Sequence, residues 1–114
     1  MSRSRSERFD ALVLDAVEAL EARWRSELSR VEFAVEDVPS PGASAPTTVP
    51  LGRAFPAGPT GPARVVVYRR PVELRAKEPS SRAELVHDVV VECVADLLGL
   101  SPDQVDPGYG EDRD

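Results

Sequence analysis

The chain of 114 residues has few of the side chains that build the commonest disulfide and metal sites, with one cysteine and one histidine. A single cysteine excludes an internal disulfide framework and a zinc site made of several cysteines, and it is typical of a reducing cytoplasm. No apolar run reaches the roughly 18 residues of a membrane-spanning helix, and the polar first residues lack the apolar segment of a signal peptide. We therefore expect one cytoplasmic domain over residues 1–114.

The net charge of −6 is unevenly distributed along the chain. Residues 84–114 contain nine acids and one base, whereas residues 1–83 contain eleven acids and thirteen bases. The acidic C-terminal third argues against nucleic acid as a partner, since phosphates are bound by lysine and arginine. It suits a cation or a basic segment of another protein. The alternative is a solvated helix face followed by an acidic tail over residues 103–114.

Two regions of the N-terminal half have a clear secondary-structure pattern. Ser4 and Glu7 are spaced as a capping box, which begins a helix by satisfying free backbone N–H groups. Apolar residues then recur at helical spacing and predict one buried stripe: Phe9, Leu12, Val13, Ala16, Val17, Leu20 and Trp24. Residues 31–36 alternate in polarity and predict a half-buried strand.

The middle of the chain is dominated by proline and glycine. Residues 39–62 hold seven of the eleven prolines and four of the seven glycines, a composition that excludes a helix or a central strand. This long loop is either a surface excursion or the lining of a cleft. The β-branched residues 64–68 predict a strand. Because Pro71 restricts the residues after it to an edge or a bend, residues 72–74 are expected to add a short edge strand, where a peptide could pair.

The last helix is expected to begin near Ser81, in a second capping box with Glu84, and to end at Gly99. Its buried face should contain Leu85, Val86, Val89, Val90, Cys93, Val94 and Leu97. Four acids recur every fourth residue and form a ladder of carboxylates: Glu84, Asp88, Glu92 and Asp96. Like charges at this spacing repel one another. A cation, the arginines Arg69, Arg70 or Arg75, or water would offset that repulsion.

Residues 92–99 read ECVADLLG, where a zinc peptidase helix would read HExxHxxG. In that motif two histidines bind zinc and the glutamate activates a water molecule. In this motif frame and in the order of the preceding helix, strands and loop, the chain resembles the small bacterial zincin-like metallopeptidases, or minimal zincins. The resemblance implies an α+β fold with an N-terminal helix, a small twisted sheet, a long Pro/Gly-rich loop and a C-terminal helix of the metal-binding type.

By this resemblance Glu92 and Asp96 stand at the two histidine positions, point into the cleft, and are candidate metal ligands. Cys93 stands at the position of the catalytic glutamate. The third ligand position is Pro102, which has no donor atom, and Asp103 follows one residue later as a candidate third ligand, with Asp106 as an alternative. Oxygen ligands suit Mg²⁺, Ca²⁺ or Mn²⁺ better than Zn²⁺.

Cys93 is expected to be a buried structural residue, because a thiol is a poor general base near neutral pH. His87 lies six residues before it, roughly 240° around the helix, and is badly placed to activate it. His87 is expected at the surface or at the rim of the cleft.

Three functional interpretations remain open. The first is a pseudoenzyme that lacks zinc peptidase activity and keeps its cleft for a peptide or protein. The second is a hydrolase with a divalent cation held by Glu92, Asp96 and Asp103. The third is a non-catalytic module whose acidic tail recruits a basic partner.

Overall fold

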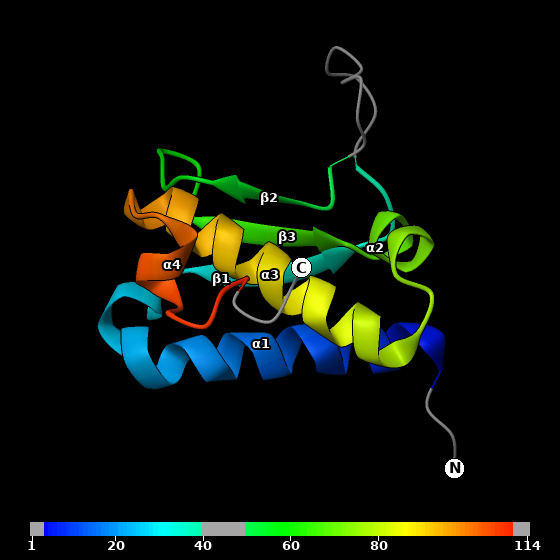
Figure 1. Ribbon diagram of the computed structural model, residues 1–114. Helices are drawn as coiled ribbons and strands as arrows, with labels where there is room; N and C mark the ends of the chain where they lie inside the picture. Colours follow the sequence, from blue (N-terminus) through cyan, green and yellow to red (C-terminus); the bar gives the residue numbers. More distant parts are fainter. Residues whose placement is uncertain (1–3, 40–49, 111–114) are drawn as a thin grey trace.

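A computed structural model describes residues 4–39 and 50–110 of the chain. Its elements follow the order α1 (Arg5–Leu28), β1 (Glu32–Glu36), β2 (Gly52–Phe55), β3 (Arg64–Tyr68), α2 (Arg69–Arg75), α3 (Pro79–Leu98) and α4 (Pro102–Val105). The fold is α+β, with an N-terminal helix, a three-stranded mixed sheet and a long C-terminal helix (Figure 1). No helix within the described ranges is long and apolar enough to cross a lipid bilayer.

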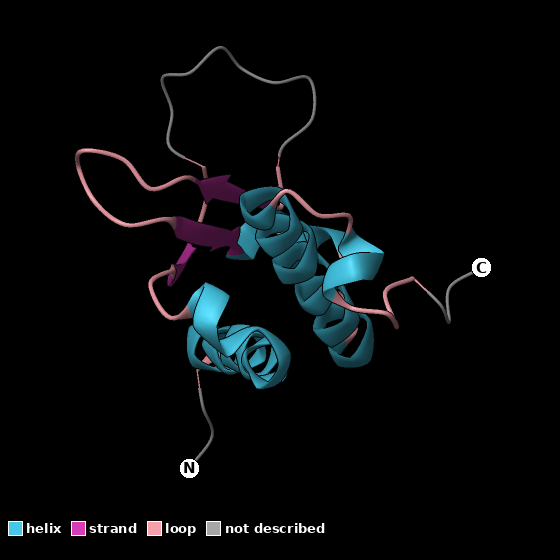
Figure 2. Ribbon diagram, turned by 90° about the vertical axis from the view of Figure 1, so that its left-hand side faces the viewer, coloured by secondary structure: helices cyan, strands magenta, loops and turns pink. Residues whose placement is uncertain are grey.

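The sheet has the order β1-β3-β2, so the most apolar strand lies in the centre. β1 pairs with β3 in parallel, with Val35 opposite Val67, and β2 pairs with β3 antiparallel, with Gly52 opposite Val67. α3 lies across β2 and β3, and α1 packs alongside α3 (Figures 1 and 2). Among the described residues, β2 is therefore an edge strand whose second side bears no partner strand.

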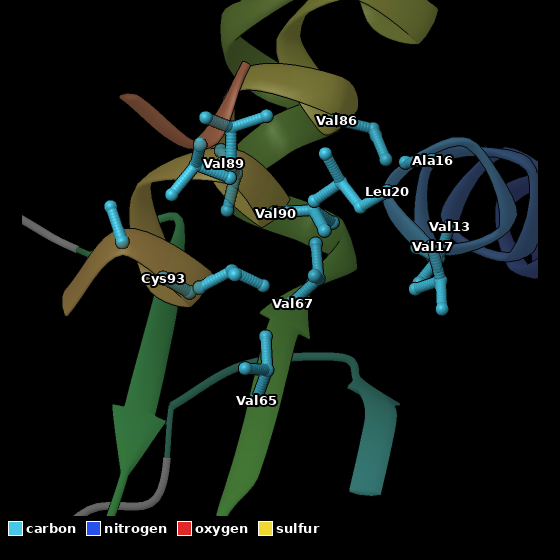
Figure 3. Close-up of a cluster of buried hydrophobic side chains, with 14 of the residues drawn as sticks. Val13, Ala16, Val17, Leu20, Val65, Val67, Val86, Val89, Val90 and Cys93 are labelled. Atoms are coloured by element: carbon cyan, nitrogen blue, oxygen red, sulfur yellow. The ribbon is translucent and has the colours of Figure 1, made fainter. Parts of the chain in front are cut away.

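The core lies between α1, α3 and the sheet (Figure 3). Val65 and Val67 of β3 have no exposed surface, and neither have Val86 and Val90 of α3. The predicted stripe of α1 is buried at Phe9, Val13, Ala16, Val17 and Leu20, while Leu12 and Trp24 pack against it partly exposed. α3 buries more than the predicted face, because Val91 and Ala95 on its other flank are also covered. Leu85 and Leu97 are only partly buried.

Several local predictions are confirmed. Ser4 caps α1, and the reciprocal bonds of the capping box are present with Glu7. The strands predicted at 31–36 and 64–68 are β1 and β3, with β1 shorter by one residue. Gly99 ends α3 in the left-handed conformation at φ 70°, which favours glycine because it has no Cβ.

Two predictions for the middle of the chain are wrong. Residues 72–74 do not form an edge strand but lie in α2, where Pro71 occupies the first turn and its missing N–H leaves no hydrogen bond unmade. The loop predicted over 39–62 contains β2, a strand of four residues that is stabilised by pairing with β3. Residues 40–49 of that loop lie outside the described residues.

The start of α3 and the segment after it also differ from the prediction. α3 begins at Pro79 with Glu78 as its N-cap, so the capping box expected at Ser81 does not form. Proline is well suited to the first helical position, since its φ is already helical. Residues 103–105 were expected to begin an acidic tail, but they lie in α4. Val105 of this helix has no exposed surface. Residues 111–114 of that tail lie outside the described part of the chain.

Gly52 is expected to be required for the close approach of β2 to α3. A Cβ atom at this position would lie 2.5 Å from Val89 Cγ1 and 3.0 Å from the carbonyl oxygen of Val66. Replacing Gly52 by alanine should therefore lower the free energy of unfolding by about 1–3 kcal/mol through overpacking. Gly58→Ala is the matched control, because nothing lies within 4 Å of a Cβ there. Urea unfolding of both variants tests this, and equal effects at the two positions would contradict it.

Candidate functional site

Glu92 and Asp96, the two residues at the ligand positions of the zinc motif, are both exposed on α3. Asp96 follows Val89 by two helical turns, so the two side chains leave the helix in nearly the same direction. Val89 is the residue that a side chain on Gly52 of β2 would meet. Asp96 therefore lies on the flank of α3 that borders β2. We call Glu92, Asp96 and the outer edge of β2 the α3–β2 surface.

Cys93, at the position of the catalytic glutamate, faces the protein interior (Figure 3). Its side chain is a free thiol, and the residue is 8% exposed. A Cβ on Gly52 would lie 3.3 Å from its sulfur, so β2 covers it directly. Burial, followed by the negative charges of Glu92 and Asp96, raises the pKa of the thiol to about 12. Cys93 is therefore protonated near neutral pH and is neither a useful base nor a thiolate nucleophile. The predicted burial of Cys93 is confirmed.

His87 is held by Asp106, a contact that the sequence did not reveal. The distance between His87 Nε2 and Asp106 Oδ2 is 2.7 Å, and both side chains are partly exposed. The hydrogen bond from His87 is the main cause that lowers the pKa of Asp106, and a second bond from the backbone N–H of Gly108 adds to it. The ring of His87 is thereby directed at the segment after α4 rather than at Cys93.

Glu92 also has a partner in this segment. The hydroxyl of Tyr109 donates a hydrogen bond to Glu92 Oε2. This bond, with burial and the charge of Glu92 as further causes, raises the pKa of Tyr109 to about 12. Residues 106–109 thus pack over α3 and engage two of its polar side chains. One oxygen of the candidate metal ligand Glu92 is already bound to a protein group.

The structure does not assemble the candidate metal ligands into one site. Asp103 is exposed on α4, and Glu92 and Asp96 are exposed on α3. Across residues 4–39 and 50–110, no group of three or more histidine, cysteine, aspartate or glutamate side chains could hold a metal ion. A divalent cation bound by Glu92, Asp96 and Asp103 stays a prediction from the sequence alone.

The four acids predicted to form a ladder of carboxylates differ in burial. Asp88 is 4% exposed, although Glu84, Glu92 and Asp96 are exposed. No buried side-chain oxygen or nitrogen in the described ranges lacks a hydrogen-bond partner, so the carboxylate of Asp88 is satisfied within the protein. Arg69 does not offset the ladder either, because it pairs with Asp37 and with Glu73, each at 3.0 Å.

Comparison with protein families shows to which family this chain belongs. A family model described as zincin-like metallopeptidase matches residues 28–111, well over half of the chain. The chain belongs to the zincin-like metallopeptidase family. The match begins at the last residue of α1 and covers the sheet, α2, α3 and α4. In a comparison with curated proteins, none matches this chain.

The zinc ion that this family name implies does not fit the side chains present. Zinc prefers histidine nitrogen and thiolate sulfur. Here the motif positions carry two carboxylates, the thiol of Cys93 is buried and protonated, and His87 is bound to Asp106. No step of zinc-assisted hydrolysis can be built from Glu92, Cys93 and Asp96.

Proposed function

We propose that this zincin-like protein is a pseudoenzyme that binds an extended, basic peptide segment at the α3–β2 surface. The observation that carries the first half of the proposal is the environment of Cys93. A general base must reach the reacting water and exchange a proton near neutral pH. Cys93 lies under Gly52 with a pKa of about 12, so it meets neither requirement.

The peptide-binding half rests on the charge beside β2 and on the edge of β2, which pairs with no further strand among residues 4–39 and 50–110. An edge strand offers unpaired backbone N–H and C=O groups, to which an extended peptide can add as a further strand. Asp96 is exposed on the flank of α3 beside this edge, and Glu92, one helical turn before it, is exposed as well. Carboxylates favour a lysine- or arginine-rich partner through charge complementarity.

The loss of peptidase chemistry is tested on purified protein. We expect less than stoichiometric zinc by mass spectrometry when no metal is added, and no cleavage of a mixed peptide library. Both results follow from the absent nitrogen donors and the buried thiol. About one zinc per chain that survives gentle chelation, together with metal-dependent cleavage, would instead establish a metal-dependent hydrolase with carboxylate ligands.

Peptide binding is tested by fluorescence anisotropy with labelled arginine-rich and glutamate-rich peptides of equal length. We expect saturable binding of the basic peptide that weakens with salt. The double change Glu92→Gln and Asp96→Asn should weaken it several-fold. Asp15→Asn with Glu18→Gln is the matched control, because both are exposed acids on α1 and the change of net charge is the same. Equal binding of both peptides, or equal weakening by the control, would disprove the proposed surface.

A further inference from the structure

A strongly basic cavity lies at the end of the molecule where both long helices begin. It has a volume of about 560 Å³. Its wall contains six cationic side chains, namely Arg5, Arg8, Arg69, Arg70, Lys77 and Arg82, against the single acid Glu73. They come from the first turn of α1, from α2, from the connection to α3 and from the start of α3. Figure 1 shows these segments together on its right-hand side. The concentration of positive charge contrasts with the chain's net charge of −6.

Most of this positive charge is not cancelled within the protein. Glu73 is already paired with Arg69, whose guanidinium also contacts Asp37. The other cations of the wall include Arg5, Arg70, Lys77 and Arg82, and none of these four forms an ion pair with any residue in 4–39 or 50–110. The cavity therefore has a surplus of cations.

Arg82 is fixed in place rather than neutralised. Its guanidinium donates hydrogen bonds to the carbonyl oxygens of Ala76, at 3.1 Å, and Lys77, at 2.7 Å. These acceptors carry no net charge, so they hold the side chain at the cavity without cancelling its charge. A fixed guanidinium loses little conformational entropy when it binds an anion.

The placement of these arginines opposes helix stability. The N-terminal end of a helix carries a partial positive charge and favours acidic side chains. Arg5 and Arg8 nevertheless stand at the start of α1, Arg82 stands near the start of α3, and the first turn of α3 has no acid. An anion in the cavity would be attracted by both helix ends as well as by the side chains.

A second, less polar cavity adjoins the first. It has a volume of about 300 Å³ and shares Arg5, Arg8, Glu73 and Arg82 with the basic cavity. Phe9, Leu12 and Pro79 supply apolar wall. Together the two cavities offer cations at one end and apolar contact at the other, within the size range of sites for small organic ligands.

We propose that this pair of cavities binds a small phosphorylated compound that carries at least two phosphoryl groups. Arginine forks match phosphate oxygens with two parallel hydrogen bonds, and several uncompensated cations favour a multivalent anion over a single phosphate. The apolar cavity would take the organic part. Arg82 precedes Glu92 by ten residues along α3, about 15 Å, so the site is separate from the α3–β2 surface and does not depend on peptide binding.

The probe for this site is inorganic tripolyphosphate, titrated calorimetrically into the full-length protein at low ionic strength. We expect saturable binding of one tripolyphosphate per chain that weakens as salt is added. The double variant Arg70→Gln and Lys77→Gln should reduce the affinity by at least about tenfold, because each removed cation takes charged hydrogen bonds with it. Both side chains are exposed, so the fold should persist, and circular dichroism of the variant checks this.

The matched control is Arg25→Gln with Arg53→Gln, two exposed arginines in the last turn of α1 and in β2 that do not line either cavity. It changes the net charge equally and should alter the affinity by no more than roughly twofold, because distant charges are screened. The proposal is overturned by an absence of saturable binding in the wild type, or by equal weakening in the control. It is also overturned if a single-stranded oligonucleotide of equal phosphate number binds more tightly than tripolyphosphate.

Discussion

Replacing Cys93 by glutamate, the residue that the zinc peptidase motif has at this position, should destabilise the protein by at least about 3 kcal/mol at neutral pH. The site is 8% exposed and lies directly under Gly52, so the larger side chain must displace β2 or leave a carboxylate without water. Urea unfolding measures the loss. Asp96→His is the control, since this exposed position should change stability by no more than about 0.5 kcal/mol.

The pH dependence of this variant separates charge burial from simple overpacking. Desolvation raises the pKa of a buried carboxyl in the folded state above its unfolded value of roughly 4.3. The folded protein therefore binds this proton more tightly than the unfolded chain. Its stability is kept below about pH 4 and is lost as the pH rises toward the folded pKa. A Cys93→Glu protein that is as stable as the wild type at pH 7 would show that this position opens to solvent.

The cost of a buried glutamate also applies to a protein in which the zinc motif is restored. The triple change Glu92→His, Cys93→Glu and Asp96→His introduces the two nitrogen donors and the base, but it carries the cost of the buried glutamate. Pro102 still stands at the position that the family resemblance gives to the third ligand, and proline has no donor atom. A glutamate at position 93 would also have to fit beside Gly52 of β2, which lies directly against the sulfur of Cys93.

The elements that the sequence predicts well are those whose own residues have a clear period. α1 and β3 were found from their apolar patterns, and the burial of Cys93 follows from its place on the apolar face of α3. β2 has only four residues between prolines, and its stability comes from pairing with β3 rather than from its own pattern. Residues 72–74 belong to α2 rather than to the predicted strand, because proline, which limits a strand, is tolerated in the first turn of a helix.

The polar contacts of the site were beyond sequence reasoning for a different reason. His87 and Asp106 are separated by 19 residues, and Glu92 and Tyr109 by 17. Both contacts require the chain to reverse after α3 and return across it, and no local spacing encodes that return. Gly99 and the proline at the start of α4 mark the reversal, but they do not determine which side chains meet.

Deleting residues 103–114 should reduce the free energy of unfolding by at least about 3 kcal/mol, which is far more than the loss of a solvated acidic tail would cause. The deletion removes Val105, whose side chain is completely buried, and loses its burial at a cost of about 1.5–3 kcal/mol. It also leaves the indole N–H of Trp24 without the Val105 carbonyl oxygen, which lies 2.9 Å away, at a further cost of about 1–3 kcal/mol.

The contacts of Asp106 with His87 and of Tyr109 with Glu92 are lost in the same deletion. Asp103→Asn is the control, because it removes an exposed charge from the same segment and should change stability by no more than about 0.5 kcal/mol. Thermal and urea unfolding of the two proteins tests this difference. If the deleted protein were as stable as the control, residues 103–110 would not belong to the core, and the deletion could then be used to ask whether an acidic tail recruits a basic partner. With the expected loss, that question is answered only by charge-neutralising substitutions such as Asp103→Asn, which leave Val105 and its contact with Trp24 in place.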